Sequence, residues 1–245
     1  MTAEKQPMKG LVPGCIFSYC PGCSHTVTNR LMGELIEEMD IQDRTILVGP
    51  VGCSEMIIYY LDVDSVGAAH GRAPSVAVGI KRCRPDRIVL TYQGDGDFAA
   101  MGIAEVLNAA QLGEPISMIW VNNANYGMTG GQMGPTTLVG QRTKTSPTGR
   151  ELKSAGAPLH VSELFANLPG VAYVERVATH SEAHIRKTKE VIRHAIEVQI
   201  EGRGLSMVEV LGVCPTGWGM STKDAFIWYQ EYLMAEFPLG RFADR

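Results

Sequence analysis

Residues 88–97 read IVLTYQGDGD, and this stretch decides the fold class of the chain. Residues 88–92 form a short apolar run, which predicts a buried strand. The turn that follows places Asp95 between two glycines, and the Ala-rich segment 99–112 after it carries its apolar residues on one helical face. Asp97 is in position to cap this helix. A strand, a glycine turn and a helix in this order predict one unit of an α/β fold.

The same alternation runs along the rest of the chain. Short apolar or β-branched runs predict further strands at residues 45–48, 116–121, 171–177 and 205–211. Apolar residues spaced four apart predict a helix at 24–40, and a capping box of Thr179 and Glu182 predicts another that ends at Gly202. The sequence therefore predicts a single α/β domain over residues 1–245, with a mostly parallel sheet covered by helices on both faces. Ligands of such sheets bind at the carboxyl ends of the strands.

The composition excludes several classes of protein. The chain has 245 residues, of which 45% are hydrophobic and 20% charged, and this excludes disordered, collagenous and coiled-coil proteins. No apolar run approaches the roughly 18 residues of a membrane helix, and residues 1–5 lack the apolar core of a signal peptide. The net charge of -4 offers no basic field to a phosphate backbone. We therefore expect a cytoplasmic protein that binds neither a membrane nor nucleic acid.

Polar groups follow two of the predicted strands. Gly94 and Gly96 allow a ligand to approach the backbone closely, the start of a helix favours phosphate, and the carboxylate of Asp95 suits a hard cation. Asn122 and Asn123 offer further oxygen ligands at the end of the next strand. The alternative is that both segments are ordinary turns, in which these residue types are common.

Six cysteines are unusual in a reducing compartment, where such residues more often bind metal or do redox chemistry than form disulfides. Cys20 and Cys23 form a CxxC motif at the end of an N-terminal loop, and Cys53 and Cys214 lie next to predicted strand ends. Four thiolates hold either a tetrahedral zinc ion or an iron-sulfur cluster, and the spacing alone leaves both open. A thioredoxin-like redox pair is less favoured because no strand precedes the CxxC motif.

The two polar turns together resemble the signature of thiamine diphosphate enzymes. Gly94-Asp95-Gly96 and Asn122-Asn123 carry this resemblance, with Asn123 lying 28 positions after Asp95. It implies a thiamine diphosphate-binding fold. It also implies that Asp95, the side chain of Asn123 and the main-chain carbonyl of Asn125 ligate a Mg²⁺ that bridges to the diphosphate.

A longer series of motifs is similar to the β subunit of 2-oxoacid:ferredoxin oxidoreductases. The motifs occur in the order of that family and are Cys20-Pro21-Gly22-Cys23, Gly52-Cys53, His70-Gly71-Arg72-Ala73, Gly94-Asp95-Gly96-Asp97, Tyr126-Gly127-Met128-Thr129-Gly130-Gly131-Gln132 and Cys214-Pro215. The resemblance implies a [4Fe-4S] cluster on Cys20, Cys23, Cys53 and Cys214, which we favour over zinc. Residues 1–23 would then be a cluster-binding N-terminal segment.

Two further loops belong to the expected site. His70 and Arg72 are donors that suit a diphosphate or a substrate carboxylate, and the resemblance favours a contact with cofactor or substrate over a surface turn. Gly127, Thr129 and Gln132 lie in a Gly-rich loop that we expect to bind the cofactor, with a simple turn as the alternative.

We predict no ligand or catalytic role for the remaining cysteines and histidines. Cys15 and Cys83 are predicted to be buried structural residues. The other five histidines, including His25, His160 and His184, are expected to be solvated or capped side chains.

The resemblance implies oxidative decarboxylation, in which a 2-oxo acid, coenzyme A and oxidised ferredoxin give acyl-CoA, CO₂ and reduced ferredoxin. It favours a branched-chain substrate, 2-oxoisovalerate, with 2-oxoglutarate and pyruvate as alternatives. The implied partners are an α subunit that carries the thiamine-activating Glu, a γ subunit, and ferredoxin or a ferredoxin-like δ subunit. The aromatic segment 224–245 either docks on these partners or packs on its own sheet. Two other classes stay open, namely a thiamine enzyme subunit with structural zinc and a non-catalytic electron-transfer subunit.

Overall fold

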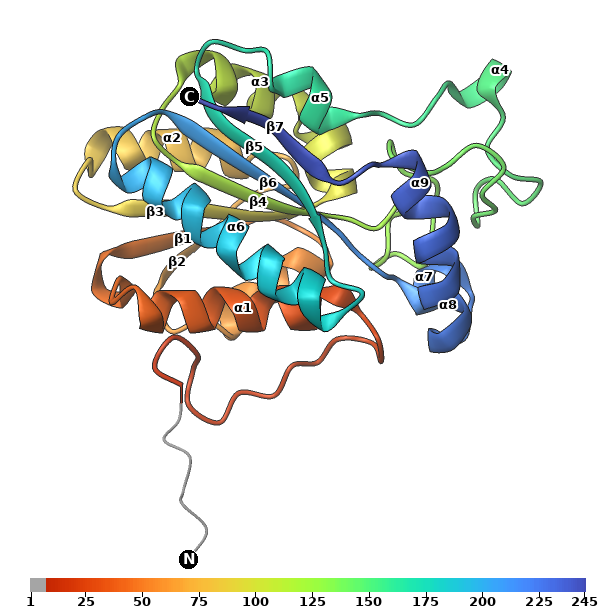
Figure 1. Ribbon diagram of the computed structural model, residues 1–245, viewed down its shortest axis with the longest axis horizontal. Helices are drawn as coiled ribbons and strands as arrows, with labels where there is room; N and C mark the ends of the chain where they lie inside the picture. Colours follow the sequence, from red (N-terminus) through yellow and green to blue (C-terminus); the bar gives the residue numbers. More distant parts are fainter. Residues whose placement is uncertain (1–7) are drawn as a thin grey trace, which may run out of the picture.

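Seven strands build one sheet in a computed structural model that describes residues 8–245 (Figure 1). The strand order is β2-β1-β3-β4-β6-β5-β7, and all neighbours are parallel except β5 and β7. The strands are β1 (Thr45–Gly49), β2 (Asp64–Gly67), β3 (Ile88–Gly94), β4 (Ser117–Asn122), β5 (Val171–Ala178), β6 (Leu205–Leu211) and β7 (Gly240–Asp244). The expected lack of a leader at residues 1–5 and the start of the predicted segment 1–23 lie outside the described residues.

The central strands are buried almost throughout, because helices cover both faces of the sheet. All five predicted strands are confirmed to within two residues at either end. The sequence does not predict β2 or β7, which occupy the two edges of the sheet. Every residue of β2 is exposed, so this strand carries no apolar run from which it could be recognised.

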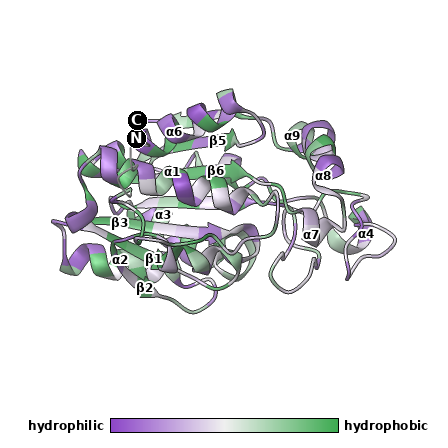
Figure 2. Cartoon of the chain, turned by 90° about the horizontal axis from the view of Figure 1, so that it is seen from below, coloured by the Kyte–Doolittle hydropathy of each residue, from purple (hydrophilic) through white to green (hydrophobic). Residues whose placement is uncertain are grey.

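Two helical layers enclose the sheet, as the sequence predicts. One face is covered by α1 (Ser24–Glu38) and α6 (Glu182–Ile200), and the other by α2 (Ala73–Cys83), α3 (Ile103–Leu112) and α5 (Val161–Phe165) (Figure 1). Each layer forms its own apolar core against the sheet. Figure 2 shows the hydrophobic colouring of β5 and β6 inside the fold and hydrophilic outer turns on the helices.

Shorter elements complete the chain. They are η1 (Gln42–Arg44), η2 (Cys53–Tyr59), η3 (Asp97–Met101), α4 (Leu152–Ala155), α7 (Pro215–Trp218), α8 (Thr222–Trp228), η4 (Tyr229–Leu233) and α9 (Met234–Glu236). The last four cover the carboxyl end of the sheet, where Tyr229, Leu233 and Phe237 are buried in a third apolar cluster. Residues 224–245 thus contain buried anchors, while Ile227 and Tyr232 in the same segment stay exposed.

Two helix starts differ from the sequence prediction. Asp97 does not cap α3, because a π-helical turn begins at Asp97 and α3 begins only after Gly102. The cap of α6 is Ser181, whose hydroxyl accepts the N–H of His184, whereas the hydroxyl of Thr179 donates to Ser24 on α1. In both places a tertiary contact uses the side chain that local spacing had assigned to a cap.

Four loops meet at the carboxyl edge of the sheet, after β1, β3, β4 and β6. These loops carry Cys53, Asp95, Asn123 and Cys214, so the parallel topology brings the predicted ligands to one edge. Over residues 8–245, no helix combines the length and the apolar character needed to cross a membrane.

Candidate cofactor site

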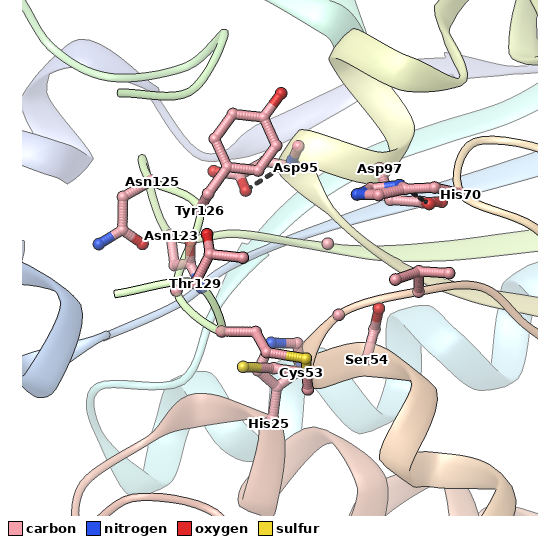
Figure 3. A pocket seen from close by; sticks show the side chains of 16 residues that line it. His25, Cys53, Ser54, His70, Asp95, Asp97, Asn123, Asn125, Tyr126 and Thr129 are labelled. Carbon is pink, nitrogen blue, oxygen red and sulfur yellow. Dashed lines mark hydrogen bonds and ion pairs between the residues drawn. The ribbon is translucent and has the colours of Figure 1, made fainter. Parts of the chain in front are cut away.

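A cavity opens where these loops converge (Figure 3). It is lined by the loop after β1, the turn before α2, the end of β3 and the loop after β4. The predicted residues that line it are Cys53, His70, Gly94, Asp95, Gly96, Asn123, Asn125, Gly127 and Thr129. The side chain of Arg72 instead forms an ion pair with Glu105 on α3, and Gln132 is not among the lining residues.

Asp95 is the buried carboxylate of the cavity, with 2% of its surface exposed. Its Oδ1 accepts the N–H of Gly96 at 2.8 Å, and its Oδ2 accepts the hydroxyl of Thr136 at 2.7 Å. Burial raises the pKa of Asp95 to about 6, although these hydrogen bonds and the N–H groups of Asn123 and Asn125 favour the ionised form. The carboxylate therefore lies where a cation would stabilise its charge.

The unpaired side-chain oxygen of Asn123 accompanies this carboxylate. Within the described residues, the side-chain oxygens of Asn123 and Asn125 are both buried without a hydrogen-bond partner, and the Asn125 amide lies towards Cys214. Between them, Ala124 adopts a left-handed conformation with φ of 56°, and its N–H donates to the side chain of Asn122 at 3.2 Å. A buried carboxylate beside an unsatisfied amide oxygen fits a hard divalent cation such as Mg²⁺, which prefers oxygen ligands.

The glycines make room for a ligand and for close packing. At Gly94 a Cβ would meet open space, whereas at Gly96 it would overlap the ring of Tyr126. The turn can therefore keep its backbone against Tyr126 only without a side chain at position 96. The start of the following turn, at Gly96 and Asp97, lines the cavity.

Asp97 is the centre of a second buried hydrogen-bond group. Its Oδ1 lies 2.5 Å from Nδ1 of His70 and accepts the N–H of Gly71 at 2.6 Å, and its Oδ2 accepts the side-chain amide of Gln93 at 2.6 Å. Figure 3 shows His70 beside Asp97 at the rim of the cavity. Since Asp97 holds Nδ1, the other ring nitrogen of His70 is left for a ligand.

Thr129 and Gln132 bind each other. The Thr129 hydroxyl donates to the Gln132 side chain at 2.5 Å, and the Gln132 amide donates to the Thr129 carbonyl at 2.9 Å. These bonds close the Gly-rich loop and leave Thr129 at the mouth of the cavity.

The four predicted cluster ligands gather next to this cavity. A Cβ built on Gly127 would lie 3.2 Å from Sγ of Cys214 and 3.8 Å from Sγ of Cys53. Burial, together with the nearby thiols of Cys214, Cys53 and Cys20, raises the pKa of Cys23 to about 12. Burial likewise raises the pKa of Cys214 to about 11. Buried thiols of this kind ionise readily only when a metal centre supplies positive charge.

These four cysteine thiols lie near one another but are not arranged as a coordination shell. All six cysteines are free, and Cys20 is exposed. In the part of the chain that the structure describes, no three His, Cys, Asp or Glu side chains are already arranged around a metal position. Cys15 is half-buried and Cys83 is exposed, so the prediction that Cys83 is a buried structural residue is wrong. Cys83 lies in the last turn of α2, which faces solvent.

Sequence reasoning missed two residues of the site. His25, expected to be solvated or capped, is 2% exposed, lines the cavity, and lies 2.6 Å from the hydroxyl of Tyr92. Its burial lowers its pKa to about 4. Its position two residues after Cys23 was the available signal, whereas nothing near Thr136 in the sequence connects it with Asp95.

A buried ionic network in the interior of the fold supports the loop after β4. Glu209 on β6 accepts the side-chain amide of Asn122 at 2.8 Å and the hydroxyl of Ser162 at 2.5 Å. Nε of Arg176 on β5 lies 2.8 Å from the same carboxylate, and Glu209 and Arg176 are both fully buried. Asn122 therefore holds the loop rather than facing the ligand.

Comparison with known proteins identifies the family of this chain. Residues 50–210 match the family model described as thiamine pyrophosphate enzyme, C-terminal TPP binding domain, thiamine pyrophosphate being another name for thiamine diphosphate. The chain is 45% identical over 227 residues to ketoisovalerate oxidoreductase subunit VorA of Methanothermobacter thermautotrophicus, which covers 93% of this chain and 48% of that protein. It is 35% identical to 2-oxoglutarate synthase subunit KorB of Archaeoglobus fulgidus, over 81% of this chain and 70% of that subunit.

A solved structure shares the fold. The 2-oxoglutarate:ferredoxin oxidoreductase from Magnetococcus marinus superposes with a TM-score of 0.77 at 22% identity, over 99% of this chain and 86% of that chain. The chain spans about half the length of the ketoisovalerate oxidoreductase subunits that it matches. By its matching domain and its relatives, the chain belongs to the thiamine pyrophosphate enzymes and, among them, to the 2-oxoacid:ferredoxin oxidoreductase subunits.

Proposed function

We propose that this chain is the subunit of a 2-oxoacid:ferredoxin oxidoreductase that binds both the diphosphate of thiamine diphosphate and a [4Fe-4S] cluster. The observation that carries the proposal is the meeting of two ligand sets at one edge of the sheet. The oxygen groups of Asp95 and Asn123 lie on one side of the loop after β4, and the thiols of Cys53 and Cys214 lie beside Gly127 in that loop.

The oxygen groups form the proposed Mg²⁺ site. Asp95 would supply a carboxylate, Asn123 its unpaired side-chain oxygen and Asn125 its main-chain carbonyl, with the diphosphate and water as remaining ligands. Thr136 and the N–H of Gly96 hold the Asp95 carboxylate in place through their hydrogen bonds. A few protein ligands combined with phosphate oxygens is the arrangement that Mg²⁺ favours.

Cys20, Cys23, Cys53 and Cys214 form the proposed cluster site. When bound, thiamine diphosphate supplies the nucleophilic carbon and the electron sink for decarboxylation, and the cluster takes up electrons one at a time. The chain itself would orient both groups and bring them close together, since Asp95 lies near enough to Cys53 and Cys214 for its charge to raise the pKa of both thiols. Thiolate ligation also suits a reducing compartment, which supports a location in the cytoplasm.

His70 is the proposed contact to cofactor or substrate. The carboxylate of Asp97 accepts a hydrogen bond from Nδ1 of His70, so Nε2 can face the ligand in a defined orientation. Arg72 is a less direct candidate, because its guanidinium pairs with Glu105. Thr129 lines the cavity, where the neighbouring N–H groups suit the cofactor while its own hydroxyl donates to Gln132.

The proposed reaction converts a 2-oxo acid, coenzyme A and oxidised ferredoxin into acyl-CoA, CO₂ and reduced ferredoxin. The ketoisovalerate oxidoreductase subunit, at 45% identity, supports 2-oxoisovalerate as the substrate over 2-oxoglutarate, whose relative is 35% identical. Coenzyme A is bound in the solved structure that shares the fold. The proposed partners are an α subunit carrying the thiamine-activating Glu, a γ subunit, and ferredoxin or a ferredoxin-like δ subunit.

The test is anaerobic purification of the native complex followed by a substrate panel. We expect about four irons per chain, and reduction of a viologen dye that requires coenzyme A and is fastest with 2-oxoisovalerate. A panel with 2-oxoglutarate and pyruvate separates the three substrate classes. Stoichiometric zinc in place of iron would instead favour the alternative of a thiamine enzyme subunit with a structural metal. Iron without any coenzyme A-dependent reduction would favour the non-catalytic subunit.

A further inference from the structure

The side chain of Asn125 has no role in the proposed Mg²⁺ site, which uses its main chain. This side chain is 2% exposed. Among residues 8–245, neither its Oδ1 nor its Nδ2 has a hydrogen-bond partner. An amide that is buried without partners is destabilising, and such groups are rare in folded proteins unless a ligand completes them.

The main chain and the side chain of Asn125 face the two different proposed sites. Its main-chain N–H lies close enough to Asp95 to favour the ionised carboxylate, on the proposed Mg²⁺ side. Its side chain points to the opposite side of the loop, away from Asp97 and His70 (Figure 3). There it lies against Cys214 at the start of α7.

Two glycines place the Asn125 amide next to the Cys214 sulfur. A Cβ on Gly217 would overlap Nδ2 of Asn125 and lie 2.7 Å from Sγ of Cys214. A Cβ on Gly127 would lie 3.8 Å from Oδ1 of Asn125 and 3.2 Å from the same Sγ. The amide and the thiol therefore border the same narrow space, which only glycines at positions 127 and 217 leave open.

We propose that Asn125 sets the reduction potential of the cluster by donating an Nδ2–H hydrogen bond to the sulfur of Cys214. This inference rests on the proposed function, because it requires Cys214 to be a cluster ligand. A thiolate accepts such a hydrogen bond more strongly than a thiol, so the amide gains its missing partner when the cluster is present. The N–H dipole stabilises the negative charge added on reduction, and hydrogen bonds to cluster sulfurs raise the reduction potential for this reason.

The consequence is a direct link between the two centres. The N–H of Asn125 acts on the Mg²⁺ ligand Asp95, and its side chain acts on the ligand Cys214. Asn125 is thus a positioning residue that adjusts the electron acceptor from within the cation-binding loop.

The experiment measures the cluster rather than turnover. The assembled complex is prepared anaerobically as wild type, Asn125→Leu and Asn125→Asp, with Asn108→Leu as the matched control on the exposed face of α3. Iron content is determined first, and the midpoint potential is then followed by the electron paramagnetic resonance signal of the reduced cluster. We expect a more negative potential in Asn125→Leu, a still more negative one in Asn125→Asp because of its charge, and no shift in Asn108→Leu.

A second readout covers the case in which a variant loses its cluster. In wild-type complex labelled with ¹⁵N in the asparagine side chains, we expect a ¹⁵N hyperfine coupling to the reduced cluster. Lack of that coupling, or an unchanged potential in Asn125→Leu with full iron, would overturn the tuning role and leave the proposed function standing. Zinc in place of iron in the wild type would overturn both.

Discussion

At the scale of the residue, Asp95 shows how burial prepares a side chain for a ligand. The carboxylate is almost completely buried, and burial raises its pKa to about 6 although four hydrogen-bond donors surround it. The donors orient the group but do not supply a full positive charge. A divalent cation does, so the proposed role of Asp95 follows from its environment as well as from its place between two glycines.

The first prediction concerns Asp95→Asn. Loss of residues that only orient a metal ligand costs about 10- to 100-fold in affinity, so loss of the ligand carboxylate should weaken Mg²⁺-dependent thiamine diphosphate binding by more than about 100-fold. Isothermal titration of the purified chain or complex measures this affinity. Asp86→Asn is the control, because Asp86 is exposed and pairs with the neighbouring Arg84 and Arg87. Unchanged binding in Asp95→Asn would remove Asp95 from the site.

The second prediction concerns Cys53→Ser. A serine hydroxyl is a poor ligand for iron, so we expect the iron content per chain to fall and the visible absorbance of the cluster to be altered. Thiamine diphosphate binding should stay within about tenfold of wild type, because the oxygen ligands are intact. Cys83→Ser, on the exposed end of α2, should leave both measurements unchanged. Full iron in Cys53→Ser would contradict the ligand assignment.

At the scale of the element, one arginine organises the long connection between β4 and α5. The guanidinium of Arg150 is buried, and among residues 8–245 it donates only to main-chain carbonyls of this connection. Its acceptors are the carbonyls of Gly134, Pro135, Thr137, Ala155, Gly156 and Ala157, at 2.8 to 3.2 Å. The segment that it ties together includes Thr136, which holds Asp95. Arg150 therefore supports the site without touching it.

The third prediction is that Arg150→Met loosens this connection. A buried acceptor left unpaired costs about 1–3 kcal/mol, so the free energy of unfolding should fall by at least that amount. Limited proteolysis should cut within residues 134–157 before it cuts elsewhere, and urea unfolding gives the energy. Arg142→Met, at an exposed position of the same segment, is the matched control. If Arg150→Met resists the protease as well as the wild type does, the connection keeps its structure without Arg150, which would contradict the prediction.

At the scale of the whole molecule, a buried ionic network joins parts that are far apart in the sequence. Arg176 on β5 contacts Glu209 on β6, Glu163 on α5 and the carbonyl of Pro238 near the C-terminus. Glu209 in turn holds Asn122 at the end of β4. The network thus connects the loop of the candidate site with the last part of the chain through the interior of the sheet.

The fourth prediction is that Arg176→Met is strongly destabilising at neutral pH. Removing one partner of a buried pair costs about 3–5 kcal/mol, because the Glu209 carboxylate stays buried without its counter-charge. Urea unfolding at pH 7 measures the loss. Glu163→Gln should cost less, because about a third of the Glu163 side chain is exposed and solvent screens its charge.

At acid pH, the difference in the free energy of unfolding between wild type and Arg176→Met should become smaller. Burial alone would raise the pKa of Glu163, but its hydrogen bonds to Arg176 and the charge of Arg176 hold it below the usual value of 4.5. A lowered pKa stabilises the fold above pH 4.5 and loses this effect as the pH falls through the lowered value. The variant lacks this contribution, so its unfolding energy should depend less on pH in that range. A constant difference from pH 7 to pH 3.5 would contradict this.

The sequence alone determined the order of the five inner strands and of the three longer helices that it predicted by range, because residues 88–97 and the other apolar runs indicate buried parallel strands through local pattern. It also contained the ligand motifs, since Gly94-Asp95-Gly96 and the CxxC motif are contiguous and chemically distinctive. Both kinds of information are local, and the alternation of strands and helices is enough to bring the strand ends to one edge.

Only the tertiary structure decided which polar groups are buried, paired or left open. His25 and Thr136 joined the site, and Glu209 came to support it, because strands and loops distant in sequence pack against each other. Asp97 binds His70 instead of capping a helix for the same reason. Edge strands β2 and β7 likewise form through pairing with β1 and β5, without an apolar pattern of their own. Burial and hydrogen bonding depend on the neighbours that folding brings together, and local spacing does not encode them.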